Sequence, residues 1–554
     1  MGNDGPTLLR TPMFPPLFLG LDLSTQQLKA VLIAEDASVV HESAVHFDND
    51  LPKYNTVNGA IQGPLDGEVT SPVAMWLDAI DLLMERMKSA GVDFSAIAAI
   101  SGAGQQHGSV YWSADAETLL SSLDAKLPLR EQLAPNAFSI QRAPIWQDSS
   151  TTEDCRALED VIGGPQILAD LSGSRAYERF TGSQISKIRR LDAAAYAATS
   201  RISLVSSFIP SLFLGHIAPI EVSDASGMNL MNVLSCKWDH RLLEACGGPE
   251  LRVKLGPEPV PGGTSLGKIS EWWLKRWGFS PECIVAPFTG DNPATVVSLS
   301  APGDALLSLG TSTTLLLSIP PADTPPKRFT TSHLLSHPTT LDAQIAMLCY
   351  KNGALAREQI RDRFCEGDWD RFNTDVESTP AGNNGYMGLY FPLPEIIPPN
   401  VVGDFFYKVE DNASITPVEN IPNDAHPRAI LESQFLSIRS RIAAILPPHA
   451  PHLHRLVVAG GSSSNDTIRQ LAADLFDMKV YVSGTKQAAG MGGALLAKYA
   501  WWRAAQGDTG TFEEMTGGEV GELKCVAEPR PEMTKVYDEL VGVYQLCEEE
   551  AVKR

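Results

Sequence analysis

Two stretches of the chain place a short polar turn between apolar runs, which predicts two β-hairpins. Residues 17–33 read as an apolar strand, a Ser/Thr/Gln turn and a second apolar strand. Residues 305–317 repeat this order around a turn that begins at Gly310. The two hairpins lie about 290 residues apart, just over half of the 554-residue chain. This spacing predicts a duplicated architecture with a ligand held between two similar halves.

Other periodic segments place helices and strands around these hairpins. Apolar residues at helical spacing predict a helix over 74–88, and a short apolar run predicts a strand over 97–100. The uncharged run 202–220 contains several serines and Pro210, so we expect a buried helix there and not a membrane span. In the second half, helices over 427–446 and 467–475 flank a strand over 456–459.

Four segments lack such periodicity. Residues 114–140 resemble a surface insertion, and residues 507–531 a loop. Residues 320–342 and 377–428 are rich in Pro, Thr, Asn and Gly, which predicts irregular structure in the second half.

Composition narrows the class of protein. With 44% apolar and 20% charged residues, the chain has the make-up of a soluble globular protein of two to four domains. A formal net charge of −22 argues against nucleic acid or an anionic membrane as a general partner. The eight cysteines form no CxxC pair, and the N-terminus shows no secretory pattern. We therefore expect free thiols in the cytoplasm.

One carboxylate, Asp291, stands at a predicted strand-to-helix turn. An apolar run ends at Thr289-Gly290, after which Asn292 is suited to cap a helix that starts at Pro293. Asp291 would then project beside backbone N–H groups, where a carboxylate can accept a proton from a positioned hydroxyl. The simpler alternative is that Asp291 only caps the helix.

Three further loops carry groups that bind polar ligands. A Gly-rich turn after the strand at 97–100 presents Gln106 and His107, which can hydrogen-bond to a polyhydroxyl ligand or lie in an ordinary surface loop. Arg179 lies in an aromatic, polar context that also suits a surface salt bridge. The paired glycines Gly460-Gly461 join a strand to a helix, which lets a ligand approach the backbone.

The ordered set of these motifs resembles one family, the FGGY carbohydrate kinases, over roughly residues 17–545. The motifs that carry the resemblance are GLDLSTQQLK, GQQHG, YERFTGSQ, FTGDNPA, SLGTSTT and AGGSSSND. The resemblance implies an actin/hexokinase-like, ribonuclease H-like duplicated fold, with two α/β domains around a central cleft and a mixed five-stranded sheet in each. It implies a sugar-binding half at 1–297 and a nucleotide-binding half at 298–554.

The same resemblance implies roles for individual residues. Asp291 would be the catalytic base that takes the proton from the C5 hydroxyl of D-xylulose, with ATP as phosphoryl donor. The ketose would be held by His107, Arg179 and Asn292, with Gln106 beside them. Asp22 would help to place Mg²⁺ through water. The residues assigned to ATP are Ser24, Thr25, Gly310, Thr311, Ser312, Trp369, Gly460, Gly461 and Asn465.

Alternatives remain open at this point. The same chemistry could act on another ketose or polyol, such as ribulose or glycerol. A non-catalytic sugar or nucleotide sensor, or an actin-like ATPase, could use the same fold. The expected partners are a small ketose and ATP or ADP, with no nucleic acid and no membrane, and the expected assembly is a monomer or a homodimer.

Overall fold

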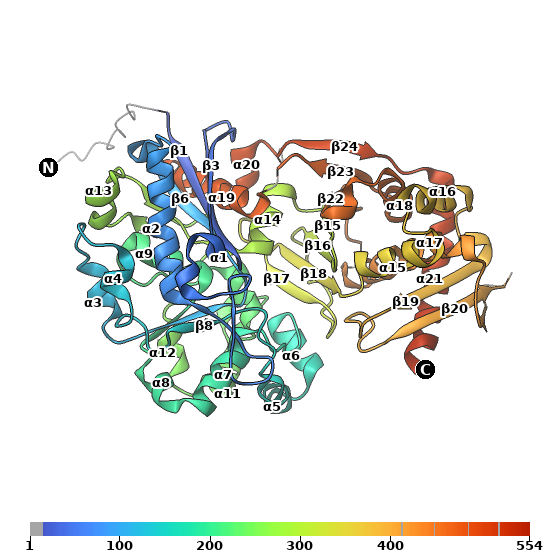
Figure 1. The fold of residues 1–554 in the computed structure, drawn as a ribbon, viewed down its shortest axis with the longest axis horizontal. Coiled ribbons are helices and arrows are strands. Elements are labelled where there is room, and N and C mark those ends of the chain that lie inside the picture. The colour runs from blue at the N-terminus through green and yellow to red at the C-terminus, as the bar shows by residue number, and fades with distance from the viewer. Residues whose placement is uncertain (1–14, 411–413, 448, 486, 519–520) are drawn as a thin grey trace.

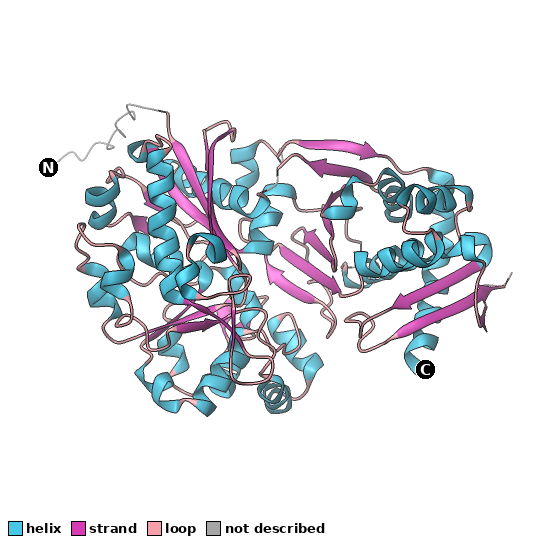
Figure 2. Cartoon of the chain, viewed as in Figure 1, coloured by secondary structure: helices cyan, strands magenta, loops and turns pink. Residues whose placement is uncertain are grey.

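The computed structural model describes residues 15–410, 414–447, 449–485, 487–518 and 521–554. The chain forms two lobes that follow one another along the sequence, the first in blue to green and the second in yellow to red in Figure 1. Each lobe is built on a mixed β-sheet with helices packed against it, which Figure 2 shows as magenta strands among cyan helices.

The first sheet contains the predicted N-terminal hairpin. Among the described residues its strands run in the order β12 (Gly267–Lys268), β13 (Ile284–Val285), β6 (Ile97–Gly104), β1 (Leu17–Leu23), β2 (Gln27–Ile33) and β3 (Val39–His46), with β14 (Thr289–Gly290) also paired to β6. Strands β1 and β6 are buried almost throughout, because helices cover the sheet.

The second sheet contains the predicted second hairpin. Its strands run in the order β17 (His333–Ser336), β18 (Gln344–Tyr350), β16 (Thr313–Ile319), β15 (Ala305–Leu309), β22 (Arg455–Ala459), β23 (Lys479–Ser483) and β24 (Leu523–Ala527).

The two sheets share one pairing pattern. In the first, β1 pairs antiparallel with β2 and parallel with β6, and β13 continues the sheet parallel to β6. In the second, β15 pairs antiparallel with β16 and parallel with β22, and β23 continues parallel to β22. The predicted duplication and its five-stranded mixed core are confirmed, and the described residues add two strands to each sheet.

Helices bury the large apolar side chains of both lobes. In the first lobe, α2 (Val73–Ser89), α9 (Val205–Leu214) and α13 (Glu271–Trp277) form one core with the sheet, and the α13 tryptophans are buried there. In the second lobe, α17 (His426–Ile445), α18 (Asp466–Phe476) and α21 (Pro531–Lys553) do the same. No helix of the described residues is long and apolar enough to cross a membrane.

The two lobes meet at α14 (Asp291–Leu299) and α19 (Ala488–Ala505). Helix α19 belongs to the second half of the sequence but packs on β1 and β6 of the first sheet, as its position in Figure 1 shows. Glycines allow the close approach: a Cβ on Gly492 would lie 1.9 Å from the Ala294 carbonyl oxygen, and one on Gly493 would lie 2.4 Å from the Gly102 Cα.

The structure differs in part from the predictions for these four segments. Residues 114–140 contain α3 (Ala116–Ser121) and α4 (Leu129–Leu133), whose apolar residues join the first core. Residues 377–428 contain a three-stranded sheet of β19 (Tyr386–Phe391), β20 (Gly403–Val409) and β21 (Ile415–Val418). Strand β17 lies within 320–342, and residues 507–531 hold α20 (Phe512–Thr516) and β24. Each of these elements is too short to show a clear period between turn-forming residues.

All eight cysteines lie among the described residues, and none forms a disulfide. The prediction of free thiols is confirmed.

Candidate active site

Asp291 is the first residue of α14, directly after β14. Pairing of β14 with the end of β6 brings it beside the loop that follows Gly104. The expected cap is corrected: Gly290 is the N-cap, so Asn292 and Pro293 already lie inside the first turn. The Asp291 carboxylate Oδ1 accepts the Asn292 backbone N–H at 3.0 Å, which holds the carboxylate at the half-buried N-terminus of the helix.

The environment of Asp291 favours a protonatable carboxylate. Surrounding protein raises the pKa of this half-buried group to about 6, mainly by desolvation, and the negative charge of Asp22 adds to the shift. Backbone N–H groups of Asn292 and Gln106 act in the opposite direction. The result is a carboxylate that is ionised at neutral pH yet basic enough to take a proton.

Gln106 holds Asn292 in place. The Asn292 amide Nδ2 donates to Gln106 Oε1 at 2.8 Å, and Gln106 is 3% exposed. A Cβ on Gly290 would lie 2.4 Å from Gln106 Cγ, so the turn before Asp291 requires glycine. These contacts join two predicted ligand residues and the predicted base in one cluster.

His107 adopts a strained backbone conformation, with φ of 70°. Its ring stacks on Phe180 with 4.5 Å between centroids, and its Nδ1 lies 2.9 Å from the Gly227 carbonyl oxygen. A carbonyl only accepts hydrogen bonds, so Nδ1 carries the proton. Burial lowers the pKa of His107 to about 3, which keeps the ring neutral and leaves Nε2 as an acceptor for a ligand hydroxyl.

Arg179 lies over the same aromatic cluster. Its guanidinium is 4.9 Å from the centre of the Tyr177 ring and 5.4 Å from that of Phe180. Its Nη2 lies 3.3 Å from Nε2 of His333. Among the described residues Arg179 makes no salt bridge, so the surface ion pair considered from the sequence is absent.

Asp22 stands at the end of β1, next to the turn of the first hairpin. It is 4% exposed, burial raises its pKa, and its Oδ1 has no hydrogen-bond partner among the described residues. Lys29 Nζ lies 3.6 Å from the other oxygen, Oδ2. The described residues hold no group of three or more metal-ligating side chains. One free carboxylate oxygen fits Mg²⁺, which commonly binds through one or two carboxylates, waters and phosphates.

The turn of the first hairpin faces the loop after β6. Ser24 Oγ donates to the Gln27 carbonyl at 2.9 Å. Thr25 Oγ1 lies 3.4 Å from Gln105 Oε1 and accepts the indole N–H of Trp146 at 2.8 Å. Both predicted residues are therefore held near the loop that carries Gln106 and His107.

The turn of the second hairpin presents free donors. Helix α15 (Ala354–Phe364) and the residue before it satisfy the turn carbonyls, since Gly353 donates to Thr311 O at 3.1 Å and Ala354 to Gly310 O at 3.0 Å. The N–H groups of Thr311 and Ser312 donate to no other described residue, and both residues are exposed. Such a turn can bind phosphate oxygens.

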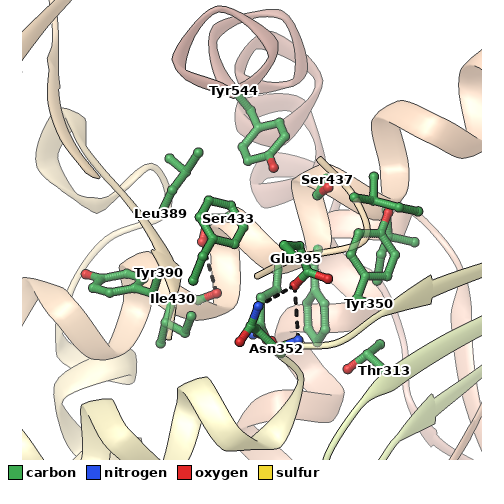
Figure 3. A pocket seen from close by; sticks show the side chains of 15 residues that line it. Thr313, Tyr350, Asn352, Leu389, Tyr390, Glu395, Ile430, Ser433, Ser437 and Tyr544 are labelled. Carbon is green, nitrogen blue, oxygen red and sulfur yellow. Dashed lines mark hydrogen bonds between the residues drawn. The ribbon is translucent and has the colours of Figure 1, made fainter. Parts of the chain in front are cut away.

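Figure 3 shows Asn352, Glu395 and Thr313, the residue that follows this turn, around one cavity. Glu395 accepts hydrogen bonds from the backbone N–H and the side-chain amide of Asn352, at 3.0 and 2.9 Å. Asn352 directly precedes Gly353 and so fixes the residues that bind the turn. Thr313 and Tyr350 line a cavity of about 30 Å³ beside this contact, which has room for one or two waters.

The remaining predicted nucleotide residues are brought together beside this turn. Gly460 packs against it, since a Cβ there would lie 3.1 Å from the Gly310 nitrogen. Asn465 caps α18 through its Oδ1, and its Nδ2 donates to Asn373 Oδ1 at 2.8 Å. Asn373 lies one turn after Trp369 on α16 (Trp369–Ser378). No atom lies within 4 Å of a Cβ on Gly461, which leaves the loop open to a ligand.

Sequence reasoning missed several residues of the site. Asp224 and Glu221 are fully buried behind Asp291, where burial raises their pKa values to about 7 and about 8. Ser206 donates to Asp224 at 2.6 Å and Thr289 donates to Glu221 at 2.6 Å. A carboxylate in an otherwise apolar stretch is the only signal that the sequence offers for such residues.

Comparison with known proteins identifies the family. Residues 135–298 match the N-terminal domain, and residues 305–501 the C-terminal domain, of the FGGY family of carbohydrate kinases. The chain belongs to this family. It is a sugar kinase, a transferase with ATP as co-substrate.

Relatives of this FGGY kinase extend over almost its full length. It is 42% identical to a protein named "Xylulose kinase" from Rattus norvegicus, with 97% of each chain covered. It is 43% identical to "Probable D-xylulose kinase A" from Aspergillus flavus (strain ATCC 200026 / FGSC A1120 / IAM 13836 / NRRL 3357 / JCM 12722 / SRRC 167), with 91% of each covered. The crystal structure of "a xyloylose kinase from Brucella ovis" is 20% identical, with a TM-score of 0.76, and covers 96% of this chain and 98% of its own. That likeness confirms the fold.

Proposed function

We propose that this FGGY kinase transfers the γ-phosphoryl group of ATP to the C5 hydroxyl of D-xylulose, which yields D-xylulose 5-phosphate. The observation that carries the proposal is the cluster of Asp291, Asn292 and Gln106 beside the neutral acceptor of His107. A base with a pKa of about 6 next to acceptors and donors for hydroxyls suits a polyhydroxyl nucleophile. The names of the rat and Aspergillus flavus relatives support D-xylulose as that nucleophile.

In this proposal the first half, residues 1–297, binds the ketose. Asn292, Arg179 and His107 hold its oxygens, and Gln106 keeps Asn292 in position. Asp291 accepts the proton of the C5 hydroxyl as the oxygen attacks the γ-phosphorus, and the bond to the β-phosphate oxygen breaks to release ADP. Because phosphoryl transfer demands little covalent work from the protein, positioning and charge neutralisation provide most of the catalysis.

The second half, residues 298–554, binds the nucleotide. The backbone of Gly310 and the free N–H groups of Thr311 and Ser312 receive phosphate oxygens, while Ser24 and Thr25 of the first hairpin lie near the transferred group. The adenosine part is bound by Gly460, Gly461 and Asn465, with Trp369 near the base. Asp22 would help to hold Mg²⁺, which would neutralise phosphate charge when bound. Free thiols support a cytoplasmic location.

The test is ATP-dependent phosphorylation by the wild-type protein of D-xylulose, D-ribulose, L-ribulose and glycerol at equal concentrations. We expect D-xylulose to have the highest kcat/KM. NMR of the product should show the phosphoryl group on C5. Preference for another member of the set would keep the chemistry and change the substrate. Binding of ketose and ATP without turnover of any of them would support a sensor and contradict the proposal.

A further inference from the structure

Strand β17 belongs to the sheet of the second half but lies against the first half. The Leu334 backbone N–H donates to the Gly173 carbonyl at 2.8 Å, and the Ser336 N–H donates to Ser226 Oγ at 3.0 Å. These two bonds hold the strand, and with it His333, against the segments that carry Arg179 and Gly227.

His333 extends the aromatic cluster of the ketose site. It is 3% exposed, and its ring lies 4.7 Å from the Tyr177 ring and 5.5 Å from the Phe180 ring. Phe180 stacks in turn on His107. A continuous set of packed rings therefore leads from a proposed ketose ligand in the first half to a residue of the second half.

The contact between His333 and Arg179 has a defined direction. A guanidinium has only donors, so Arg179 Nη2 donates and His333 Nε2 accepts, at 3.3 Å. The His333 proton must then be on Nδ1. Burial and the charge of Arg179 lower the pKa of His333, which keeps the ring neutral and able to accept.

We propose that His333 is a positioning residue, contributed by the nucleotide half, that orients the Arg179 guanidinium for the ketose. The inference rests on the proposed function, because it takes Arg179 as a ligand of the ketose. With one N–H of Arg179 committed to His333, the other donors keep a fixed direction. The ketose site is then incomplete in the first half alone, and its affinity depends on how β17 sits against that half.

The chain offers a matched control in His337. It lies four residues further on in the same segment and is 6% exposed. Its Nδ1 lies 3.3 Å from both the backbone nitrogen and Oγ1 of Thr339, and the contacts that Arg179 makes among the described residues are with Tyr177, Phe180 and His333 and not with His337. Replacing His337 by Phe removes a buried imidazole nearby without touching the proposed contact.

The experiment measures kcat and the KM values for D-xylulose and ATP in His333→Phe, His333→Gln and His337→Phe. His333→Phe keeps a ring but loses the acceptor, and we expect the D-xylulose KM to rise about tenfold, with the ATP KM within about twofold. His333→Gln offers an amide oxygen to Arg179, so its KM should return to within about threefold of wild type. His337→Phe should match wild type. An unchanged KM in His333→Phe, no rescue by Gln, or an equal rise in His337→Phe would overturn the proposal.

A double-mutant cycle with Arg179→Ala separates positioning from a general structural defect, even if one single variant folds poorly. When Arg179 is absent, we expect His333→Phe to change the D-xylulose KM by no more than about twofold. The same tenfold change in both backgrounds would show that His333 acts without Arg179.

The wild type tests the proposed function separately: if it prefers another ketose, that ketose replaces D-xylulose in every arm. If it turns over none, calorimetric titration with D-xylulose applies the same comparisons to Kd.

Discussion

The loops that follow β6 and β22 occupy equivalent positions in the two sheets. Each leaves the strand that pairs parallel to the first strand of its hairpin, and each lies beside the hairpin turn. The first loop, residues 105–108, is buried, and the second, residues 460–465, is exposed or half-buried. The same scaffold thus provides one enclosed site and one open site.

The chemistry of the two loops follows their burial. In the enclosed loop, His107 is neutral, and in the proposed function its one free lone pair accepts a hydrogen bond from a ketose hydroxyl. A ligand without that hydroxyl would leave a buried polar group unpaired. In the open loop, two glycines and the capped end of α18 present backbone to the ligand. The shared pairing pattern places the two loops, and in the proposed function their difference in burial separates ketose recognition from nucleotide binding.

The largest effect should come from Asp291, the proposed catalytic base. Asp291→Asn keeps the shape of the side chain but cannot accept a proton, so kcat should fall by about 10²-fold or more. Binding of D-xylulose, measured by calorimetry, should stay within a few-fold of wild type. If kcat were preserved, Asp291 would not be the catalytic base.

A smaller effect should appear in the pH dependence. The base must be ionised, and its pKa is raised to about 6, so kcat/KM should fall about tenfold per pH unit below that value. Asp22→Asn removes a negative charge that raises this pKa, and the acid limb of its residual activity should move to lower pH. An acid limb near the usual range of an exposed aspartate in the wild type would contradict the desolvated environment.

The smallest effect should be a change in stability at the contact between α14 and α19, where the two halves meet. Gly492→Ala places a Cβ against the backbone of α14 and should cost about 1–3 kcal/mol, read as a lower Tm. Gly542→Ala, on α21, has no atom within 4 Å of the added Cβ and serves as the control. Equal Tm values for both variants would mean that α19 does not pack closely on the first half.

Much of this arrangement could be predicted from the sequence. Apolar runs around polar turns predicted both hairpins, and their spacing predicted the duplication. The sheet of β19, β20 and β21 could not be predicted, because its short strands alternate with Pro, Gly and Asn. Glu221 and His333 were also not predicted as site residues, because each contacts the site only through tertiary packing of distant segments. For Glu221 the sequence offers only a carboxylate in an apolar stretch, which does not identify its partner.

The most direct test of the division between the loops is a pair of calorimetric titrations, with D-xylulose and with ADP, on two variants. His107→Asn tolerates the left-handed backbone and keeps a donor for Gly227, and Asn465→Asp keeps the cap of α18 but loses the amide donor. We predict that the first weakens D-xylulose about tenfold with ADP within about twofold, and that the second does the reverse. If either variant weakened both ligands equally, the assignment of ketose to one loop and nucleotide to the other would be contradicted.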